Sequence, residues 1–573
     1  MTPRLRIASA AAAAAAALAL PAAASAHAYL TRTVPAASVI LNAPPPSVQL
    51  TFDEAVEPRF AIVSVTDVQA HPETDGPVQR APSNPDTLVV PLKHLAEGWY
   101  LVYWRAISVD GHPVQGAFTF AVGPNAGPAP QFVIPHVAGT ATSPQLVVLK
   151  WLAFLSVMTA IGLFALRIAI AHPVVRRVEG TSLRWVSSAF SVSAVLGLLA
   201  LPAYLEESTA IDSLHSFLDF GGLVPLWRVT AFGRGYVDFW LCFALFCAAA
   251  WIALFADRPE RVQRSVAAIV SLTGALVAGA ATLAVPAAVG HAAQTPPRGL
   301  TVFLDWLHLV TGSIWVGGLV GLLVLWRSLP VARRVAGLVV SVPRFSNVAF
   351  VSVLLLLGTG VGEAVLHLPI VQALWQTSYG QVILVKAGIL LAAMLVAAGN
   401  LLRTKPGLGG GPEVSVRAAR LLRQLVGVEA VLVAGAILAA SVLSSLAPPP
   451  PSFAKEGAAL ARVGPGKVAA TVKQNGYTLR VLVDPNQAAA PNDFALQLTR
   501  NGRPVRNAAV TLQFAMLDMQ MPNQEYGLKE TAPGVYTRRA PALVMVGHWG
   551  LTFDVAPPGA QPFTAVVVDR TGG

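Results

Sequence analysis

Long apolar runs fill the middle of the chain, and shorter runs of alternating apolar and polar residues fill both flanks. Eight of the central runs are long enough to cross the ~30 Å hydrocarbon core of a bilayer as helices. They lie at 146–171, 185–205, 235–256, 265–290, 301–326, 345–366, 380–402 and 422–446. The pattern predicts a bundle of eight transmembrane helices.

The alternating runs on the two flanks predict two separate β domains. Residues 27–122 contain "SVQLTF", "FAIVSV", "TLVVPL", "WYLVYWRAIS" and "GAFTFAV", which favour a small antiparallel sandwich or barrel. Residues 465–573 contain "YTLRVLV", "FALQLT", "VTLQFAM", "VYTRRA" and "WGLTFDV", which favour a second β-sandwich. Proline-rich linkers at 123–144 and 447–464 separate both from a helical domain at 145–446. The fold class is therefore mixed and multidomain.

The first 26 residues have the features of a secretion signal. Arg4 and Arg6 precede an alanine and leucine block, and the segment ends in Ala24, Ser25 and Ala26, an A-x-A cleavage site. We expect cleavage after Ala26, which makes His27 the first mature residue, with a free α-amine.

Composition supports a membrane protein. Of 573 residues, 54% are hydrophobic and only 12% charged, and the mean hydropathy is +0.59. The net charge of +11 does not indicate nucleic-acid binding, because the arginines cluster in short loops between apolar runs. The two cysteines, Cys242 and Cys247, lie within one apolar run and predict neither a disulfide framework nor a thiolate metal site.

The basic residues of the loops predict the orientation in the membrane. The first, third, fifth and seventh loops hold fifteen: Arg176, Arg177, Arg184, Arg258, Arg261, Arg264, Arg327, Arg333, Arg334, Arg344, Arg403, Lys405, Arg417, Arg420 and Arg423. The alternate loops hold Arg228, Arg234 and Arg298. Since basic loops stay in the cytoplasm, we expect both β domains on the outer, periplasmic or extracytoplasmic side of the inner (plasma) membrane.

The first candidate site combines the mature N-terminus with "SVDGHPVQGAF". Asp110 and His112 are two residues apart, so on an extended segment they project from one face. His27 offers an α-amine and a ring nitrogen. Three nitrogens and one oxygen suit tetragonal Cu(II), and the general affinity order favours copper over zinc for such a set.

Residues 27–122, with "HAYL", "LTFDEAVEP" and "SVDGHPVQGAFTFAVG", resemble the CopC family of periplasmic copper-binding proteins. The resemblance implies that His27, Asp110 and His112 are Cu(II) ligands. Some members of the family also hold Cu(I) at a methionine-rich site, but residues 27–122 contain no methionine, so no such site is expected in this domain.

The second candidate site consists of ionisable residues near the outer face of the membrane. His291 ends the fourth predicted helix, Asp305 and His308 lie three apart on the fifth, and Glu363 and His367 lie four apart on the sixth. Charges within a membrane are costly and tend to mark function. For His291 and His367, at the helix ends, a role as inert headgroup-level anchors is an equal alternative.

Several stretches of residues 145–446 resemble the CopD family of membrane copper-transport proteins. They are "FLDWLHLVTGSIWVGGLVGLL", "RFSNVAFVSVLLLLGTGVGEA" and "TSYGQVILVKAGILL". The resemblance implies a copper-handling role for His308 and, less directly, for His291 and Asp305. Lys386 either pairs with Glu363 or extends to the membrane surface. The first stretch also places Gly312, Gly317, Gly318 and Gly321 where helices pack closely.

The third candidate site is a group of methionines near the C-terminus. Four of the seven methionines lie within thirty residues, and His548 lies close by; they are Met516, Met519, Met521 and Met545. Thioethers suit Cu(I), although methionine also serves as core filler. The segment resembles the YtkA-like β-sandwich domains, some of which occur in copper-handling proteins.

Together these features predict a non-enzymatic membrane protein that captures Cu(II) outside and transports copper, with copper ions, the lipid bilayer and other copper chaperones as partners. No nucleotide-binding motif is found and no nucleic acid is expected, so transport would be passive or ion-coupled. Copper sequestration, or relay to a cuproenzyme without transport, is the alternative.

Two further alternatives are weaker. The first is an enzyme that cleaves polysaccharides oxidatively with a copper brace, a site that also uses the α-amine of an N-terminal histidine and a second histidine. Here Asp110 would occupy the position where oxygen must bind to the copper. The second is a membrane electron carrier that binds haem through paired histidines. Two stacked haems would need histidines at two depths of the membrane. The sequence places His291, His308 and His367 near the outer face and only His172 near the inner face.

Overall fold

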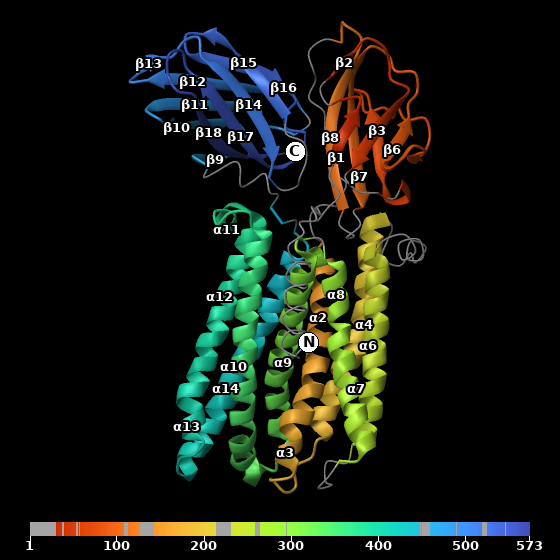
Figure 1. Ribbon diagram of the computed structural model, residues 1–573, viewed down its shortest axis with the longest axis vertical. Helices are drawn as coiled ribbons and strands as arrows, with labels where there is room; N and C mark the ends of the chain where they lie inside the picture. Colours follow the sequence, from red (N-terminus) through yellow and green to blue (C-terminus); the bar gives the residue numbers. More distant parts are fainter. Residues whose placement is uncertain are drawn as a thin grey trace, which may run out of the picture. The chain divides into compact units, whose positions relative to one another are not determined.

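The computed structural model describes residues 30–36, 39–52, 56, 58–107, 113–126, 143–213, 231–257, 264–293, 295–446, 448–449, 459–488, 490–517, 524–544 and 546–572. The chain divides into two compact units. One contains the long helices, and the other contains the two β domains (Figure 1). This is the mixed, three-part layout that the sequence predicts.

The N-terminal domain consists of two four-stranded sheets. In the first, the order is β1 (Leu30–Val34), β3 (Ser47–Phe52), β6 (Asn84–Pro91) and β5 (Gln79–Ala81). In the second, it is β2 (Ile40–Leu41), β8 (Pro113–Val122), β7 (Gly98–Ile107) and β4 (Ile62–Thr66). Strand β3 has the expected alternation, because Val48, Leu50 and Phe52 are buried while their neighbours are partly exposed.

The helical unit contains eight membrane spans among the described residues, as predicted. They are Pro144–Val175, Arg184–Ile211, Gly233–Ala256, Val266–Val289, Arg298–Ser328, Val331–His367, Ser378–Gly407 and Pro412–Leu443. The first is α2 (Pro144–Leu166), extended by η2 (Arg167–Ala171) and α3 (His172–Val175). The middle spans are α4 (Arg184–Ser213), α6 (Ala231–Ala256), α7 (Val266–Thr282) with α8 (Ala284–Val289), and α9 (Arg298–Ser328).

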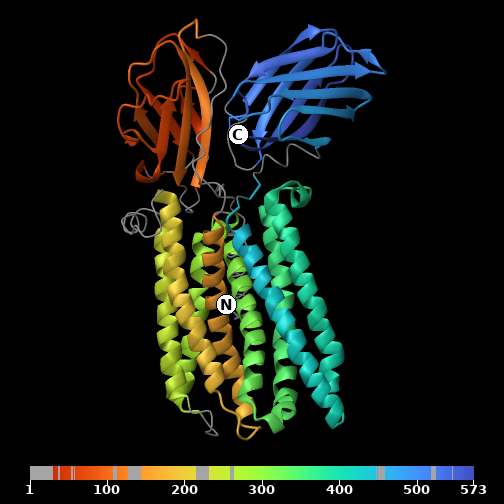
Figure 2. The same ribbon diagram turned by 180° about the vertical axis from the view of Figure 1, so that it is seen from behind.

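The last three spans include two of the helices that carry the candidate membrane site. They are α10 (Arg334–His367), preceded by η5 (Val331–Arg333); α12 (Ser378–Gly399), extended by η6 (Asn400–Thr404) and α13 (Lys405–Gly407); and α14 (Pro412–Leu443). Helix α9 packs along α10 and α2, and α14 packs on α12, α9 and α2. In the view from behind, α14 runs in front of the bundle beside α2 and α12 (Figure 2).

Glycines allow α9 to approach its neighbours closely, as expected. A Cβ at Gly317 would collide with the backbone of Gly162 in α2, and one at Gly318 would collide with the ring of Phe345 in α10. Such close backbone approach is typical of helix packing in membranes. The glycines therefore fix α9 between α2 and α10, and α9 carries two residues of the candidate site.

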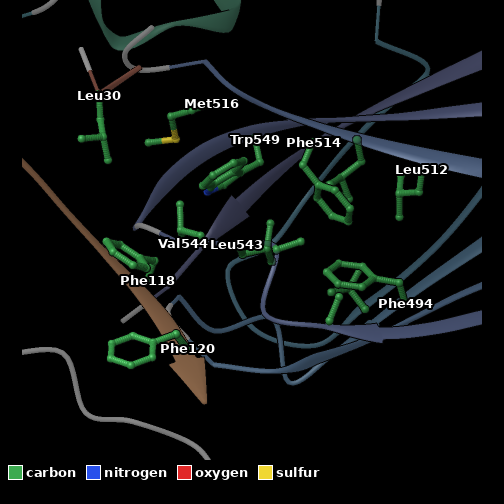
Figure 3. Close-up of a cluster of buried hydrophobic side chains, with 14 of the residues drawn as sticks. Leu30, Phe118, Phe120, Phe494, Leu512, Phe514, Met516, Leu543, Val544 and Trp549 are labelled. Carbon is green, nitrogen blue, oxygen red and sulfur yellow. The ribbon is translucent and has the colours of Figure 1, made fainter. Parts of the chain in front are cut away.

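The C-terminal domain is a sandwich of ten strands. The order is β10 (Val468–Gln474), β11 (Tyr477–Asp484), β12 (Asn492–Arg500), β16 (Val535–Ala540), β15 (Gln524–Ala532), β14 (Ala509–Met516), β17 (Gly547–Ala556), β18 (Phe563–Thr571) and β9 (Ala461–Val463), with β13 (Arg503–Pro504) beside β12. Strand β15 pairs with both β14 and β16 and so connects the two layers. Phe494, Leu512, Phe514 and Trp549 lie in its buried core (Figure 3).

Candidate metal centre

The candidate membrane site forms near the ends of three helices. Helix α9 begins at Arg298, α10 ends at His367 and α12 begins at Ser378, so these three ends lie on the same side of a bundle whose spans alternate in direction. Asp305 and His308 come from α9, and Glu363 and His367 come from α10. Helix α12 adds Lys386.

The ring of His308 is held by hydrogen bonds to α10, one with the side chain of Thr359 and one with the backbone of Leu356. Its Nδ1 lies 2.9 Å from Oγ1 of Thr359 in α10. The Thr359 hydroxyl donates its own proton to the carbonyl oxygen of Leu355, at 2.8 Å, so its oxygen is left to accept from His308. We therefore assign the proton of His308 to Nδ1, which leaves a lone pair on Nε2. A second group that orients the ring is the usual arrangement of a metal-binding histidine.

His367 is in a different state, because both of its ring nitrogens are engaged. Its Nδ1 lies 2.8 Å from the carbonyl oxygen of Glu363, which can only accept, so Nδ1 donates. Its Nε2 then accepts from Oγ1 of Thr295 at 3.2 Å. His308 thus has an open nitrogen, whereas His367 must break a hydrogen bond to bind a metal ion.

Acidic and basic groups lie close together around His308. Asp305, Glu363 and Lys386 are near enough for their charges to interact, and Lys386 is the cation of the group. Oε1 of Glu363 is buried with no hydrogen-bond partner among the described residues. An oxygen of this kind can accept a proton or contact a cation.

The described residues do not form a ready-made metal cage. They include no group of three His, Cys, Asp or Glu side chains placed to hold one ion. The structure thus brings Asp305, His308, Glu363 and Lys386 to one level without closing them into a coordination shell. For His291, only the backbone is described, in the short helix η4 (His291–Ala293) between α8 and α9.

His27, Asp110 and His112 lie outside the described residues, but the strands next to them are described. Strands β7 and β8 pair as far as Ile107 opposite Pro113, and residues 108–112 connect the two strands in the sequence. Leu30 is the register partner of Phe52, whose ring contacts that of Trp104 in β7 at 5.3 Å between centroids.

Of the C-terminal methionines, the structure describes Met516. It is 3% exposed and lies in the buried cluster, opposite Trp549 in the strand register (Figure 3). Met519, Met521 and Met545 lie outside the described residues. His548 is half-buried, and its carbonyl oxygen accepts a hydrogen bond from the backbone N–H of Leu517 at 2.8 Å.

Comparison with known proteins identifies all three parts of the chain. Residues 30–123 match the CopC domain, residues 339–443 match copper resistance protein D (CopD), and residues 471–554 match the YtkA-like family. Copper transport protein CutJ of Bacillus subtilis (strain 168) is 26% identical over 545 residues, which cover 92% of this chain and 93% of CutJ.

Two further relatives resemble the N-terminal domain alone. Protein YobA of Escherichia coli (strain K12) is 36% identical over 96 residues, 17% of this chain and 77% of YobA. The crystal structure of CopC from Methylosinus trichosporium OB3b has 30% sequence identity and covers 18% of this chain and 99% of that chain, with a TM-score of 0.17.

The chain is thus a multi-pass membrane protein of a copper-related class. Its N-terminal domain belongs to the CopC family, and the same chain carries a CopD region and a C-terminal YtkA-like domain.

Sequence reasoning did not single out Thr359 or Tyr379. Thr359 lies one helical turn before Glu363, on the same face of α10, and this spacing was the available signal. Tyr379 lies two turns before Lys386 on α12, where the charges of Glu363 and Asp305 act on it. Both are polar residues next to the predicted ionisable ones.

Proposed function

We propose that this protein captures Cu(II) on the outer face of the membrane and carries copper across through the helical unit. The observation that carries the proposal is the His308–Thr359 pair. It fixes an imidazole with a free Nε2 beside carboxylates at the outer ends of three helices. Neutral imidazole is a copper ligand, and an incomplete coordination shell lets an ion leave as well as enter.

Cu(II) capture is proposed at His27, Asp110 and His112. The Leu30–Phe52 pair and the Phe52–Trp104 contact support it, because they bring the start of β1 near the end of β7. His27 precedes Leu30 by three residues, a reach of about 10 Å. Asp110 lies three residues beyond Ile107, so the two parts of the clamp can meet.

Transfer to the membrane is proposed to involve reduction or ligand exchange. Met519, Met521, Met545 and His548 are the candidate Cu(I) ligands, and other copper chaperones are candidate partners. Met516 is the weakest candidate, since its buried position in the core opposite Trp549 supports a packing role.

Copper content of cell fractions tests the proposal. Cells that express the intact chain at low external copper should hold more cytoplasmic copper than cells that express His308→Ala. His71→Ala is a matched control, because His71 is exposed and pairs with Asp67 on the surface of the CopC domain. Equal cytoplasmic copper in all strains, with copper retained outside, would instead support sequestration or relay without transport.

The clamp has its own test. One extra residue placed before His27 in the mature chain should weaken Cu(II) binding and change its electron spin resonance spectrum, since the α-amine would be lost as a ligand. An unchanged Cu(II) affinity and an unchanged spectrum would exclude the α-amine of His27 as a copper ligand.

A further inference from the structure

A second ionisable group lies deeper in the helical unit, away from the His308 site. Glu429 is near the middle of α14, seventeen residues after Pro412 and fourteen before Leu443. It is 4% exposed, and its Oε1 accepts a hydrogen bond of 3.0 Å from the indole Nε1 of Trp315 in α9. The side chain of Asn400 lies beside the same carboxyl.

Glu429 is aligned with the His308 site along α9. Trp315 follows His308 by seven residues, so both lie on one face of the helix, about 10 Å apart along its axis. The carboxyl to which Trp315 donates therefore lies about two helical turns further into the bundle than His308.

Among the described residues, no cation forms an ion pair with the carboxyl of Glu429. The titratable or charged groups on its own helix and on the elements packed against it are Lys150 on α2; Arg298, Asp305, His308 and Arg327 on α9; Arg334, Arg344, Glu363 and His367 on α10; Tyr379 and Lys386 on α12; Arg403 on η6; Lys405 on α13; and Glu413, Arg417, Arg420 and Arg423 on α14.

These groups are mostly far from Glu429 or directed elsewhere. Arg423 lies about 9 Å away along α14, and its guanidinium stacks over Trp326. Lys150 bonds to the carbonyl oxygen of Ser444, near the opposite end of α14. Arg403 follows Asn400 by three residues, but its side chain is exposed. A buried carboxylate without a cation is costly in a membrane, so a proton must neutralise it at rest.

We propose that Glu429 is a proton-binding site through which copper movement is coupled to proton movement. The inference rests on the proposed transport function and identifies the ion that would drive it. When a copper cation moves inward from His308, its charge replaces that of the proton. The carboxyl O–H bond then breaks, the proton passes to water at one membrane face, and Glu429 is reprotonated after copper leaves.

Substitution by glutamine isolates this role. Glu429→Gln keeps the side-chain length and an oxygen that accepts from Trp315, and it removes only the ability to exchange a proton. Glu413→Gln is the matched control, because Glu413 lies on the same helix but its side chain is 88% exposed.

Sealed vesicles that contain the full chain and an internal pH dye test the proposal. Copper with ascorbate is added outside, and internal copper and internal pH are followed together. The intact chain and Glu413→Gln should show a pH change in proportion to the copper that enters, and Glu429→Gln should lose at least nine-tenths of that change. Copper entry without a pH change in the intact chain would overturn the inference but leave transport standing. No copper entry by the intact chain would overturn both.

A second measurement does not depend on folding of the variant. Dicyclohexylcarbodiimide reacts with protonated carboxyls in apolar surroundings, and peptide mapping distinguishes Glu429 from Glu363 and Asp305. The intact chain should be labelled at Glu429, with less labelling while copper is transported. An unlabelled Glu429 in the absence of copper would contradict a resident proton.

Discussion

The Nδ1 atom of His308 lies 2.9 Å from Oγ1 of Thr359, and this contact between α9 and α10 orients the imidazole ring that we propose as a copper ligand. Without the hydroxyl, the ring would be free to rotate and to change tautomer. Loss of a group that orients a ligand typically reduces metal affinity about 10- to 100-fold.

Thr359→Val should therefore lower copper uptake into vesicles about tenfold, whereas Thr359→Ser, which keeps the hydroxyl, should retain most of it. Thr282→Val is the matched control, because Thr282 is equally buried but bonds only to the carbonyl oxygen of Ala278 within α7. An equal loss in both valine variants would show a general effect of the substitution and contradict the assigned role.

Lys386 should stabilise the parts of α9 and α10 that carry Asp305 and Glu363, because its charge acts on both carboxyls. Lys386→Met removes this cation and should lower the melting temperature. Adding Glu363→Gln should restore part of the loss. Thermal unfolding in detergent checks this, and a double variant no more stable than Lys386→Met would mean that the charges are independent.

Gly317→Ala should disrupt packing of α9 on α2, since the added methyl group meets the backbone of Gly162 and has no flexible side chain to displace. We expect a loss of about 1–3 kcal/mol. The control is Gly388→Ala in α12, where nothing lies within 4 Å of the added atom. The melting temperatures of the two variants in detergent should differ, and equal values would contradict the packing.

Asp569 should make the YtkA-like domain sensitive to pH. Burial raises the pKa of this carboxyl from 3.8 to about 6, although Asn486 and Thr571 donate hydrogen bonds to it. Because the folded state holds the proton more tightly than the unfolded state, the contribution of this group to stability falls as pH rises from about 4 to about 6. The difference is on the order of 3 kcal/mol.

Hydrogen exchange of the β18 amides, corrected for the intrinsic pH dependence, measures this effect in the full chain. Protection should be lower at pH 7 than at pH 4, and Asp569→Asn should reduce the difference. The same pH dependence in the variant would assign it to other groups.

The helical part of the fold was predictable because a bilayer demands long apolar segments, and all eight predicted spans correspond to observed helices. The strands were predictable where one face is buried, as in β3. Helix ends were less predictable: α10 begins at Arg334, eleven residues before the predicted apolar run, because the mostly apolar residues 335–342 belong to the same helix, which continues through Pro343.

The candidate site was predictable in residue type but not in hydrogen bonding. Sequence spacing placed Asp305 with His308 and Glu363 with His367, because each pair shares a helix face. It could not show that Thr359 and Thr295 leave one histidine open and engage the other, since those contacts join segments 51 and 72 residues apart. A lone carboxylate in an apolar run, such as Glu429, gives no sign of its partners until the helices are packed.

Copper uptake into sealed vesicles by two single-histidine variants tests the central claim most directly. His308 and His367 lie at the same end of the bundle, but the Nε2 atom of His367 is hydrogen-bonded to Thr295, whereas His308 is hydrogen-bonded to Thr359 through Nδ1. The intact chain should take up copper, His308→Ala should lose at least nine-tenths of the rate, and His367→Ala should retain more than half. Equal rates in the two variants would contradict a copper path through His308.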